Sequence, residues 1–192
     1  MTIGDGVKTI GYSAFQGSGM TSVILGNSIE TIGQYAFKEC GNLENIVIPD
    51  SVITLGISSF NYCQKAKSIV IGNGVKTISN NVFESCNAVT AVTIGNSVES
   101  IGYKAFYGLS YLKNVIIPES VITIGNSAFE RVGGTFNKTT FTFLGTTPPT
   151  IQAATFYTDY LKKIIVPKGC GDAYKTATNW ANFADYIEEA TE

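Results

Sequence analysis

The sequence predicts a right-handed, horseshoe-like solenoid of stacked repeats, mainly β with short helical turns. A parallel strand ladder is expected on its concave face and a helical cap at its C-terminus. The first observation is a phenylalanine that returns after 22, 23, 23, 23, 23 and 27 residues, at Phe15, Phe37, Phe60, Phe83, Phe106, Phe129 and Phe156. The second is a branched apolar pattern with the same period. Because such a unit cannot bury its apolar side alone, stacked neighbours must build a continuous core.

Each repeat begins with a short strand whose inward residues follow the pattern Leu-x-x-Ile-x-Ile. Three repeats supply Leu43, Ile46 and Ile48; Val89, Val92 and Ile94; and Leu112, Val115 and Ile117. This spacing fits the Leu-x-x-Leu-x-Leu core of leucine-rich repeats, whose period lies in the same range. The sequence therefore predicts one leucine-rich-repeat domain over residues 1–166, irregular over 132–155, with a C-terminal cap of the same domain over residues 167–192.

The remainder of the repeat predicts a turn, a second extended segment and a compact return. A proline or glycine such as Pro49 or Gly72 follows the strand and marks the turn. A short extended piece, for example residues 31–33, then leads into a compact turn or single helical turn that ends in Ala-Phe. The opposite-charge neighbours expected on adjacent coils of this segment are Lys8 with Glu30 and Lys76 with Glu99.

The candidate binding surface is the outward side of the strand ladder. Because side chains alternate along a strand, the residues between the inward ones point outward. They form two columns. The first holds mostly short polar side chains: Ser22, Asn45, Ser68, Ala91, Asn114 and Lys163. The second, the apolar column, holds mostly branched apolar side chains: Ile24, Val47, Val70, Thr93, Ile116 and Ile165. The predicted binding residues are Ile24, Asn45, Val47, Ser68, Val70, Thr93, Asn114 and Ile116.

The apolar column has two interpretations. Branched residues suit a pleated surface, so strand propensity alone accounts for them. A contiguous exposed apolar strip is also typical of a binding site. The sequence does not decide between these two hypotheses.

The regular period fails between Val132 and Thr155. This segment contains a glycine pair at 133–134 and a threonine-rich strand over residues 139–143. One interpretation is an aberrant penultimate repeat that adjusts the coil before the end of the stack. The other is a protruding loop used for contact, because long connections often carry function.

The pattern changes to a helical one after the last predicted strand, residues 161–166. Apolar residues recur at helical spacing at Ala173, Tyr174, Ala177 and Trp180. We expect Asp172 to cap this short helix. Because a terminal repeat must cover the last open face of the core, Trp180 is expected to act as a plug and not as a ligand-binding aromatic.

Three of the four cysteines, Cys40, Cys63 and Cys86, hold one repeat position three residues after the phenylalanine. Later repeats place Leu109 and Val132 there, so the position is a small core site and buried free thiols are favoured. A disulfide between adjacent coils is the alternative hypothesis, because the strand spacing lies within the Cα range of a bridge. Metal binding is disfavoured, because a column of like residues does not surround an ion.

The composition disfavours several classes of function. The chain has no histidine and no glycine-rich phosphate-binding motif, so neither an enzyme nor a cofactor is predicted. A formal net charge of −2 disfavours nucleic acid as a partner. No apolar run approaches the roughly 20 residues of a membrane-spanning helix, and the N-terminus lacks the features of a signal peptide. Because the chain opens in the second half of a repeat, we expect residues preceding Gly4 to be missing.

The unit at residues 95–121, GNSVESIGYKAFYGLSYLKNVIIPESV, resembles the BspA-like leucine-rich repeat of bacterial and protist surface proteins. The resemblance is carried by its Ser-Val, Ile-Gly, Ala-Phe and Ile-x-Ile-Pro, and it extends over residues 4–131. Where the familiar leucine-rich repeat has Asn or Cys after the strand, this chain has Pro or Gly. The buried asparagine ladder of that repeat is therefore not expected here.

The resemblance implies a function without catalysis. It suggests a protein-binding, glycan-binding or adhesion module of a secreted or cell-surface protein, with recognition on the concave strand face and a host extracellular partner. The alternative, of a different class, is a structural spacer or stalk that displays other domains of a longer surface protein. In that case the apolar column is covered by a neighbour or merely tolerated.

Overall fold

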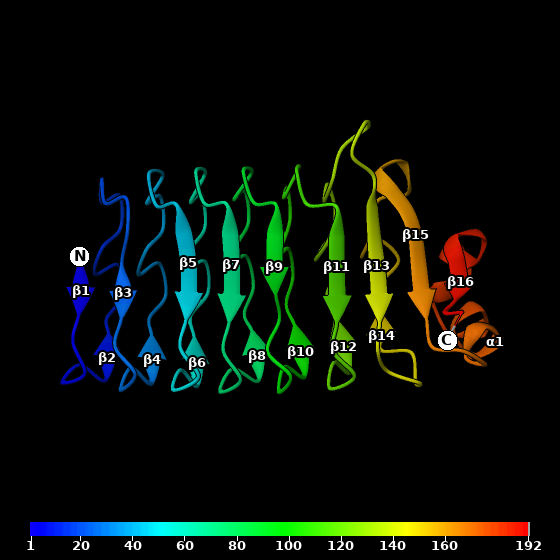
Figure 1. Ribbon diagram of the computed structural model, residues 1–192, viewed down its shortest axis with the longest axis horizontal. Helices are drawn as coiled ribbons and strands as arrows, with labels where there is room; N and C mark the ends of the chain where they lie inside the picture. The colour runs from blue at the N-terminus through cyan, green and yellow to red at the C-terminus, as the bar shows by residue number, and fades with distance from the viewer. Residues whose placement is uncertain (192) are drawn as a thin grey trace.

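The computed structural model describes residues 1–191 and shows one row of stacked parallel coils (Figure 1). Each coil but the last contributes a strand to a front row and a two-residue strand to a rear row. The front strands are β1 (Thr2–Ile3), β3 (Ile24–Leu25), β5 (Asn45–Ile48), β7 (Ser68–Ile71), β9 (Ala91–Thr93), β11 (Asn114–Ile117), β13 (Thr139–Phe143) and β15 (Leu161–Val166). The rear strands are β2 (Thr9–Ile10), β4 (Thr31–Ile32), β6 (Thr54–Leu55), β8 (Thr77–Ile78), β10 (Ser100–Ile101), β12 (Thr123–Ile124) and β14 (Thr150–Ile151). The predicted leucine-rich-repeat solenoid is confirmed; Glu192, the last residue of the predicted cap, lies outside the described residues.

Equal repeat positions face each other across the front strands. Val47 lies opposite Val70 and Val70 opposite Thr93, and the same register aligns the buried residues between them. A shift of one residue would turn every isoleucine of a strand toward water, so the apolar alternation holds this register. The predicted inward and outward positions therefore follow directly from the sequence pattern.

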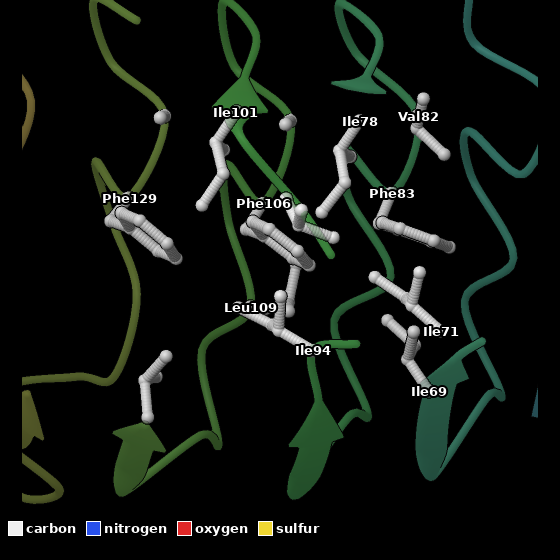
Figure 2. Packing of buried hydrophobic residues seen from close by; sticks show 14 of the residues in the cluster. Ile69, Ile71, Ile78, Val82, Phe83, Ile94, Ile101, Phe106, Leu109 and Phe129 are labelled. Atoms are coloured by element: carbon white, nitrogen blue, oxygen red, sulfur yellow. The ribbon is translucent and has the colours of Figure 1, made fainter. Parts of the chain in front are cut away.

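The repeated phenylalanine forms a stacked column through the centre of the core. Figure 2 shows Phe129, Phe106 and Phe83 side by side in a row across the coils, with their rings nearly parallel. Ring centroids along the whole column are 5.0 to 6.0 Å apart. Offset stacking at this distance is favourable beyond simple area burial, so each coil locks onto both of its neighbours.

The segment around each phenylalanine is a hydrogen-bonded turn. From Phe15 to Phe129, the residues two before and two after the phenylalanine adopt positive φ, as Tyr35 (60°) and Glu39 (61°) do around Phe37. The Phe37 N–H donates to the Ser59 carbonyl of the next coil at 2.7 Å. The sequence left a compact turn and a single helical turn as alternatives, and the structure has the compact turn. This turn directs its N–H groups to the neighbouring coil.

The strand rows are divided into shorter sheets. The described strands form β1-β3, β5-β7-β9 and β11-β13-β15-β16 in the front row, where β16 is Ile187–Glu189. They form β2-β4-β6 and β8-β10-β12-β14 in the rear row. Breaks thus fall between β3 and β5, between β9 and β11, and between β6 and β8. Figure 1 shows both front breaks as wider steps between neighbouring strands. The predicted strand ladder of the front row is therefore interrupted twice, and the rear row is interrupted once.

The breaks coincide with the residues that replace glycine where two coils touch. A Cβ built at Gly56, which follows a rear strand, would lie 2.5 Å from the carbonyl carbon of Gly33 on the preceding coil. At Gly72, which follows a front strand, it would lie 2.5 Å from the carbonyl carbon of Pro49. A side chain at either position pushes the coils apart, because backbone atoms of the neighbour occupy its space.

The three non-glycine residues in these columns among the regular repeats are Pro49, Ser79 and Pro118. Each lies in the coil that begins a new sheet, after β5, β8 and β11 respectively. The prolines also lack the N–H that Gly26 donates to the Ile3 carbonyl. Ser79 reaches the Leu55 carbonyl with its hydroxyl at 2.6 Å. The side chains in the two contact columns thus account for every break.

The irregular stretch contributes one complete coil. Strand β13 pairs with β11 on one side and β15 on the other, with a register shift between Thr139 and Thr140. Phe141 and Phe143 are buried, and the Phe141 ring meets Phe129 and Phe156 edge-on. An extra aromatic layer therefore fills the longer coil and keeps the stack continuous.

The C-terminal cap differs from the prediction in its helix start. Helix α1 (Gly171–Thr176) has Cys170 as its N-cap, and the expected capping role of Asp172 is wrong because Asp172 lies within the first turn. Glu189 of strand β16 (Ile187–Glu189) supplies the acceptor, since its carboxylate receives the N–H groups of Gly169 and Gly171 at 2.9 and 2.8 Å. These two bonds hold the pKa of Glu189 below its usual value.

Trp180 closes the last coil as a buried plug. It begins the 3-10 helix η2 (Trp180–Tyr186) and is completely buried, and its indole N–H donates to the Pro149 carbonyl at 2.8 Å. Its ring meets Phe143 edge-on at 5.1 Å. The shorter 3-10 helix η1 (Thr158–Tyr160) leads into β15. The aromatic cluster thus covers the apolar end of the stack.

Candidate functional site

The strand face is the outward surface of front strands β5, β7, β9 and β11. Val47 and Val70 lie on it with 53% and 38% of their surface exposed, and Thr93 continues the same column. Asn45, Ser68 and Ala91 form the parallel column, in which the Ser68 hydroxyl donates to the Asn45 amide oxygen at 2.7 Å. This arrangement places an apolar strip beside a strip of short polar groups.

The breaks divide the predicted site. Five of the predicted residues lie together on the β5-β7-β9 sheet: Asn45, Val47, Ser68, Val70 and Thr93. Ile24 lies on the β1-β3 sheet, and Asn114 and Ile116 lie on the sheet that begins at β11. The prediction also passed over β13, whose Thr140 and Thr142 lie opposite Asn114 and Ile116 and continue both columns.

A shallow groove of about 390 Å³ lies at the carboxyl ends of β5, β7 and β9. The apolar column forms one part of its lining, and Asp50, Asn73 and Asn96 form another. The Asp50 carboxylate accepts the Asn73 N–H at 2.6 Å, and the Asn73 amide oxygen accepts the Asn96 N–H at 2.8 Å. Asp50, Asn73 and Asn96 thus form an exposed polar column. It lies one position after the turn residue, which stands where the familiar leucine-rich repeat has its buried asparagine.

Sequence reasoning missed this polar column, although its signal was present. An Asp, Asn or Glu follows the turn glycine or proline in six repeats, at Asp5, Asn27, Asp50, Asn73, Asn96 and Glu119. Asn27 donates its N–H to Asp5, whereas no such bond spans Asn27 to Asp50 or Asn96 to Glu119 among the described residues. The column is therefore broken at the same prolines as the strands.

The rear row carries its own exposed residues. Ile53 and Ile122 are 64% and 61% exposed, as much as any residue of the strand face. The predicted pairs are confirmed: Lys8 with Glu30, and Lys76 with Glu99, each at 3.0 Å. Because both pairs are exposed they add little stability and serve mainly to align adjacent coils.

The three repeated cysteines are buried free thiols. Each Sγ donates to the carbonyl of a phenylalanine on the coil before it, as Cys86 does to Phe60 at 3.2 Å. Burial raises the pKa of Cys40 to about 11, and the neighbouring Cys86 thiol together with burial raises the pKa of Cys63. The thiolate, which is the reactive form, is therefore strongly disfavoured at Cys40 and Cys63.

We expect a thiol reagent to distinguish Cys170 from the buried column. At mildly alkaline pH, Ellman's reagent should modify the half-buried Cys170 in the folded chain, and all four cysteines only in denaturant. A folded Cys170→Ser variant should then release almost no colour. Rapid modification of further thiols in that folded variant would show that the cysteine column is accessible, contrary to the packing described.

Neither a clustered metal site nor a membrane-spanning helix is found in the part of the chain that the structure describes. It holds no group of three or more His, Cys, Asp or Glu side chains placed to bind a metal ion. Within residues 1–191, no helix has the length and apolar character needed to cross a membrane. The surface features that remain are the strand face, its groove and the loops at the ends of the strands.

The coils and their exposed strand face define a β-solenoid of the leucine-rich-repeat class. The profile of the BspA-type leucine-rich repeat region, six repeat copies long, matches residues 1–94 and 76–179. The chain therefore belongs to the BspA-type leucine-rich-repeat family, as its sequence predicted. No curated protein matches it.

Solved structures share the fold. A leucine-rich cell surface protein from Faecalibacterium prausnitzii is 23% identical, with a TM-score of 0.65 over 86% of this chain and 54% of that one. A leucine-rich repeat protein from Bacteroides ovatus is 20% identical, with a TM-score of 0.52 over 98% and 60%. The leucine-rich repeat protein of T. pallidum is 30% identical, with a TM-score of 0.51 over 56% and 51%. The chain thus spans about half of the length of the first of these proteins.

Proposed function

We propose that the chain is a non-catalytic recognition module of a secreted or cell-surface protein, and that it binds a protein or glycan on its strand face. The observation that carries this proposal is the apolar column Val47-Val70-Thr93 beside the groove of about 390 Å³. Exposed apolar residues that are contiguous and rimmed by polar groups are typical of interaction sites. The name of the Faecalibacterium protein supports the surface location.

The short polar groups make the proposed site suitable for specific recognition. Asn45 and Ser68 present amide and hydroxyl groups on the column beside the valines. Asp50, Asn73 and Asn96 present further acceptors at the end of the groove. A ligand that covers the valines would therefore gain apolar burial and find several oriented hydrogen-bonding groups.

A structural spacer remains the second candidate, and one observation favours it. Ile53 and Ile122 on the rear row are at least as exposed as Val47 on the strand face. Branched residues thus occur on both rows, as strand propensity alone would produce. In that case the chain would act as an elongated support within a longer surface protein.

The proposal predicts a selective loss of binding by a strand-face variant. The parent chain is tested on an array of extracellular-matrix proteins and glycans, beside the double variant Val47→Glu, Val70→Glu. We expect the parent to bind at least one component and the variant to lose that binding by about tenfold or more, because two charges enter the centre of an apolar contact. Circular dichroism checks that the variant is folded.

The matched control is Ile53→Glu, Ile122→Glu. It introduces the same charges at apolar positions beside the rear strands that are more exposed than the two valines. The proposal requires this control to bind like the parent. Equal loss in both variants, or an array without any binder, would favour the spacer.

A further inference from the structure

A tight hairpin presents one phenylalanine almost entirely to solvent. Gly134 and Asn137 exchange backbone hydrogen bonds of 3.2 and 3.0 Å, which leaves Thr135 and Phe136 at the tip. Phe136 is 98% exposed. In Figure 1 this loop is the yellow-green segment that rises above the other loops between β11 and β13. Neither the core nor the strand face uses this ring.

The base of the hairpin is fixed to the stack. The Gly133 N–H donates to the Leu109 carbonyl at 2.9 Å, and the buried Thr139 hydroxyl donates to the Leu112 carbonyl at 2.6 Å. Gly133 has φ of +77°, and a Cβ there would lie 2.6 Å from the Asn137 carbonyl oxygen. Glycine is therefore required at this point, and the hairpin backbone that carries Phe136 is joined to the stack at its base.

Three lysines surround a hollow beside this phenylalanine. Lys113, Lys138 and Lys162 line a space of about 420 Å³ together with Thr135, Phe136 and Asn137. None of the three lysines forms an ion pair with another described residue, and no acidic residue is part of this lining. Asp159, three residues before Lys162, interacts with the Tyr157 hydroxyl. The hollow thus concentrates positive charge in a chain whose net charge is negative.

The lysines come from separate elements that the fold brings together. Lys113 immediately precedes β11, Lys138 ends the hairpin and Lys162 lies at the start of β15. Lys67 holds the position of Lys113 two coils earlier, immediately before β7. The hollow therefore lies at the amino ends of front strands β11 and β15, whereas the groove of the strand face lies at the carboxyl ends of β5, β7 and β9.

We propose that this hollow binds an acidic oligosaccharide, with the lysines on its anionic groups and Phe136 against a sugar ring. An ammonium group is a compact charge suited to sulfate or carboxylate, and an exposed ring supplies a flat apolar surface. The lysines line an open hollow between three elements, a shape that a chain of sugars fits better than a flat lipid surface does. An anionic ligand also relieves the mutual repulsion of three neighbouring cations.

The test is calorimetric titration of the folded chain with a heparin hexasaccharide, a hyaluronan hexasaccharide and neutral maltohexaose. We expect one or both acidic sugars to bind, more weakly at high salt, and maltohexaose not to bind. The heparin and hyaluronan arms distinguish sulfate from carboxylate recognition. Lys113→Gln, Lys138→Gln should weaken binding by about tenfold or more, because two charge-assisted contacts are lost. Phe136→Ser should also weaken it without affecting the fold, since the ring is exposed.

The control pair Lys168→Gln, Lys175→Gln removes the same charge from the C-terminal cap and should leave the affinity unchanged. The inference is overturned if neither acidic sugar binds, or if maltohexaose binds equally well. It is also overturned if the control pair weakens binding as much as the hairpin pair does. Tighter binding to phosphatidylserine vesicles than to both acidic sugars would assign the hollow to a lipid surface and would likewise reject the proposal.

Discussion

Phe106→Ala should lower the free energy of unfolding by about 3–5 kcal/mol. The ring is fully buried and stacks on Phe83 at 5.4 Å and on Phe129 at 5.2 Å. Removing it leaves a cavity in the middle of the column and deprives both neighbouring coils of a partner. Because coils of a repeat protein are stabilised by their neighbours, the loss is expected to extend beyond one repeat. Denaturant unfolding followed by circular dichroism measures the change.

The matched control for this substitution is Tyr111→Ala, which removes an exposed aromatic ring from the same repeat. It should cost no more than about 0.5 kcal/mol. Fluorescence of the single Trp180 reports whether the C-terminal cap unfolds together with the damaged coil. Similar losses for Phe106→Ala and Tyr111→Ala would contradict the assignment of the phenylalanine column as the core.

Gly56→Ala should lower the free energy of unfolding by about 1–3 kcal/mol, although it adds only one methyl group. The added Cβ would lie 2.5 Å from the carbonyl carbon of Gly33, and this backbone cannot move aside as a flexible side chain can. The expected response is a new break between β4 and β6, like the one that Ser79 accompanies between β6 and β8. Denaturant unfolding gives the stability, and amide hydrogen exchange locates the break.

Gly11→Ala provides the control at the same repeat position. A Cβ at Gly11 has no atom within 4 Å, so alanine there should be neutral or stabilise by up to about 1 kcal/mol through the unfolded state. If the two substitutions change stability alike, close contact between coils does not explain the glycine columns.

The spacing of the phenylalanine predicted the coil, and the branched apolar pattern with the same period predicted the core and the outward columns. Equivalent repeat positions pack in the same way in every coil, so a burial pattern found in one repeat also applies to its neighbours. Lys8 with Glu30 and Lys76 with Glu99 were found in the same way. The exposed Asp50-Asn73-Asn96 column also repeats with the period of the coils. It was missed because it follows the turn residue and lies outside the apolar pattern of the strands.

The features that were not predicted depend on contacts between residues that are distant in the sequence. The breaks arise where Pro49, Ser79 and Pro118 meet the backbone of the preceding coil, which a pattern of apolar residues does not encode. Glu189 caps helix α1 through a strand that follows the helix by more than ten residues, so the local choice of Asp172 was wrong. Near-complete exposure of Phe136 likewise depends on how the hairpin stands away from the stack.

The most direct test of recognition by the strand face is amide hydrogen exchange of the chain, alone and with the tightest binder found on the array. The account predicts added protection in β5, β7 and β9, which carry the apolar column and the groove, and unchanged exchange in rear strands β6 and β8. Protection confined to the rear row or to the C-terminal cap would contradict recognition by the strand face.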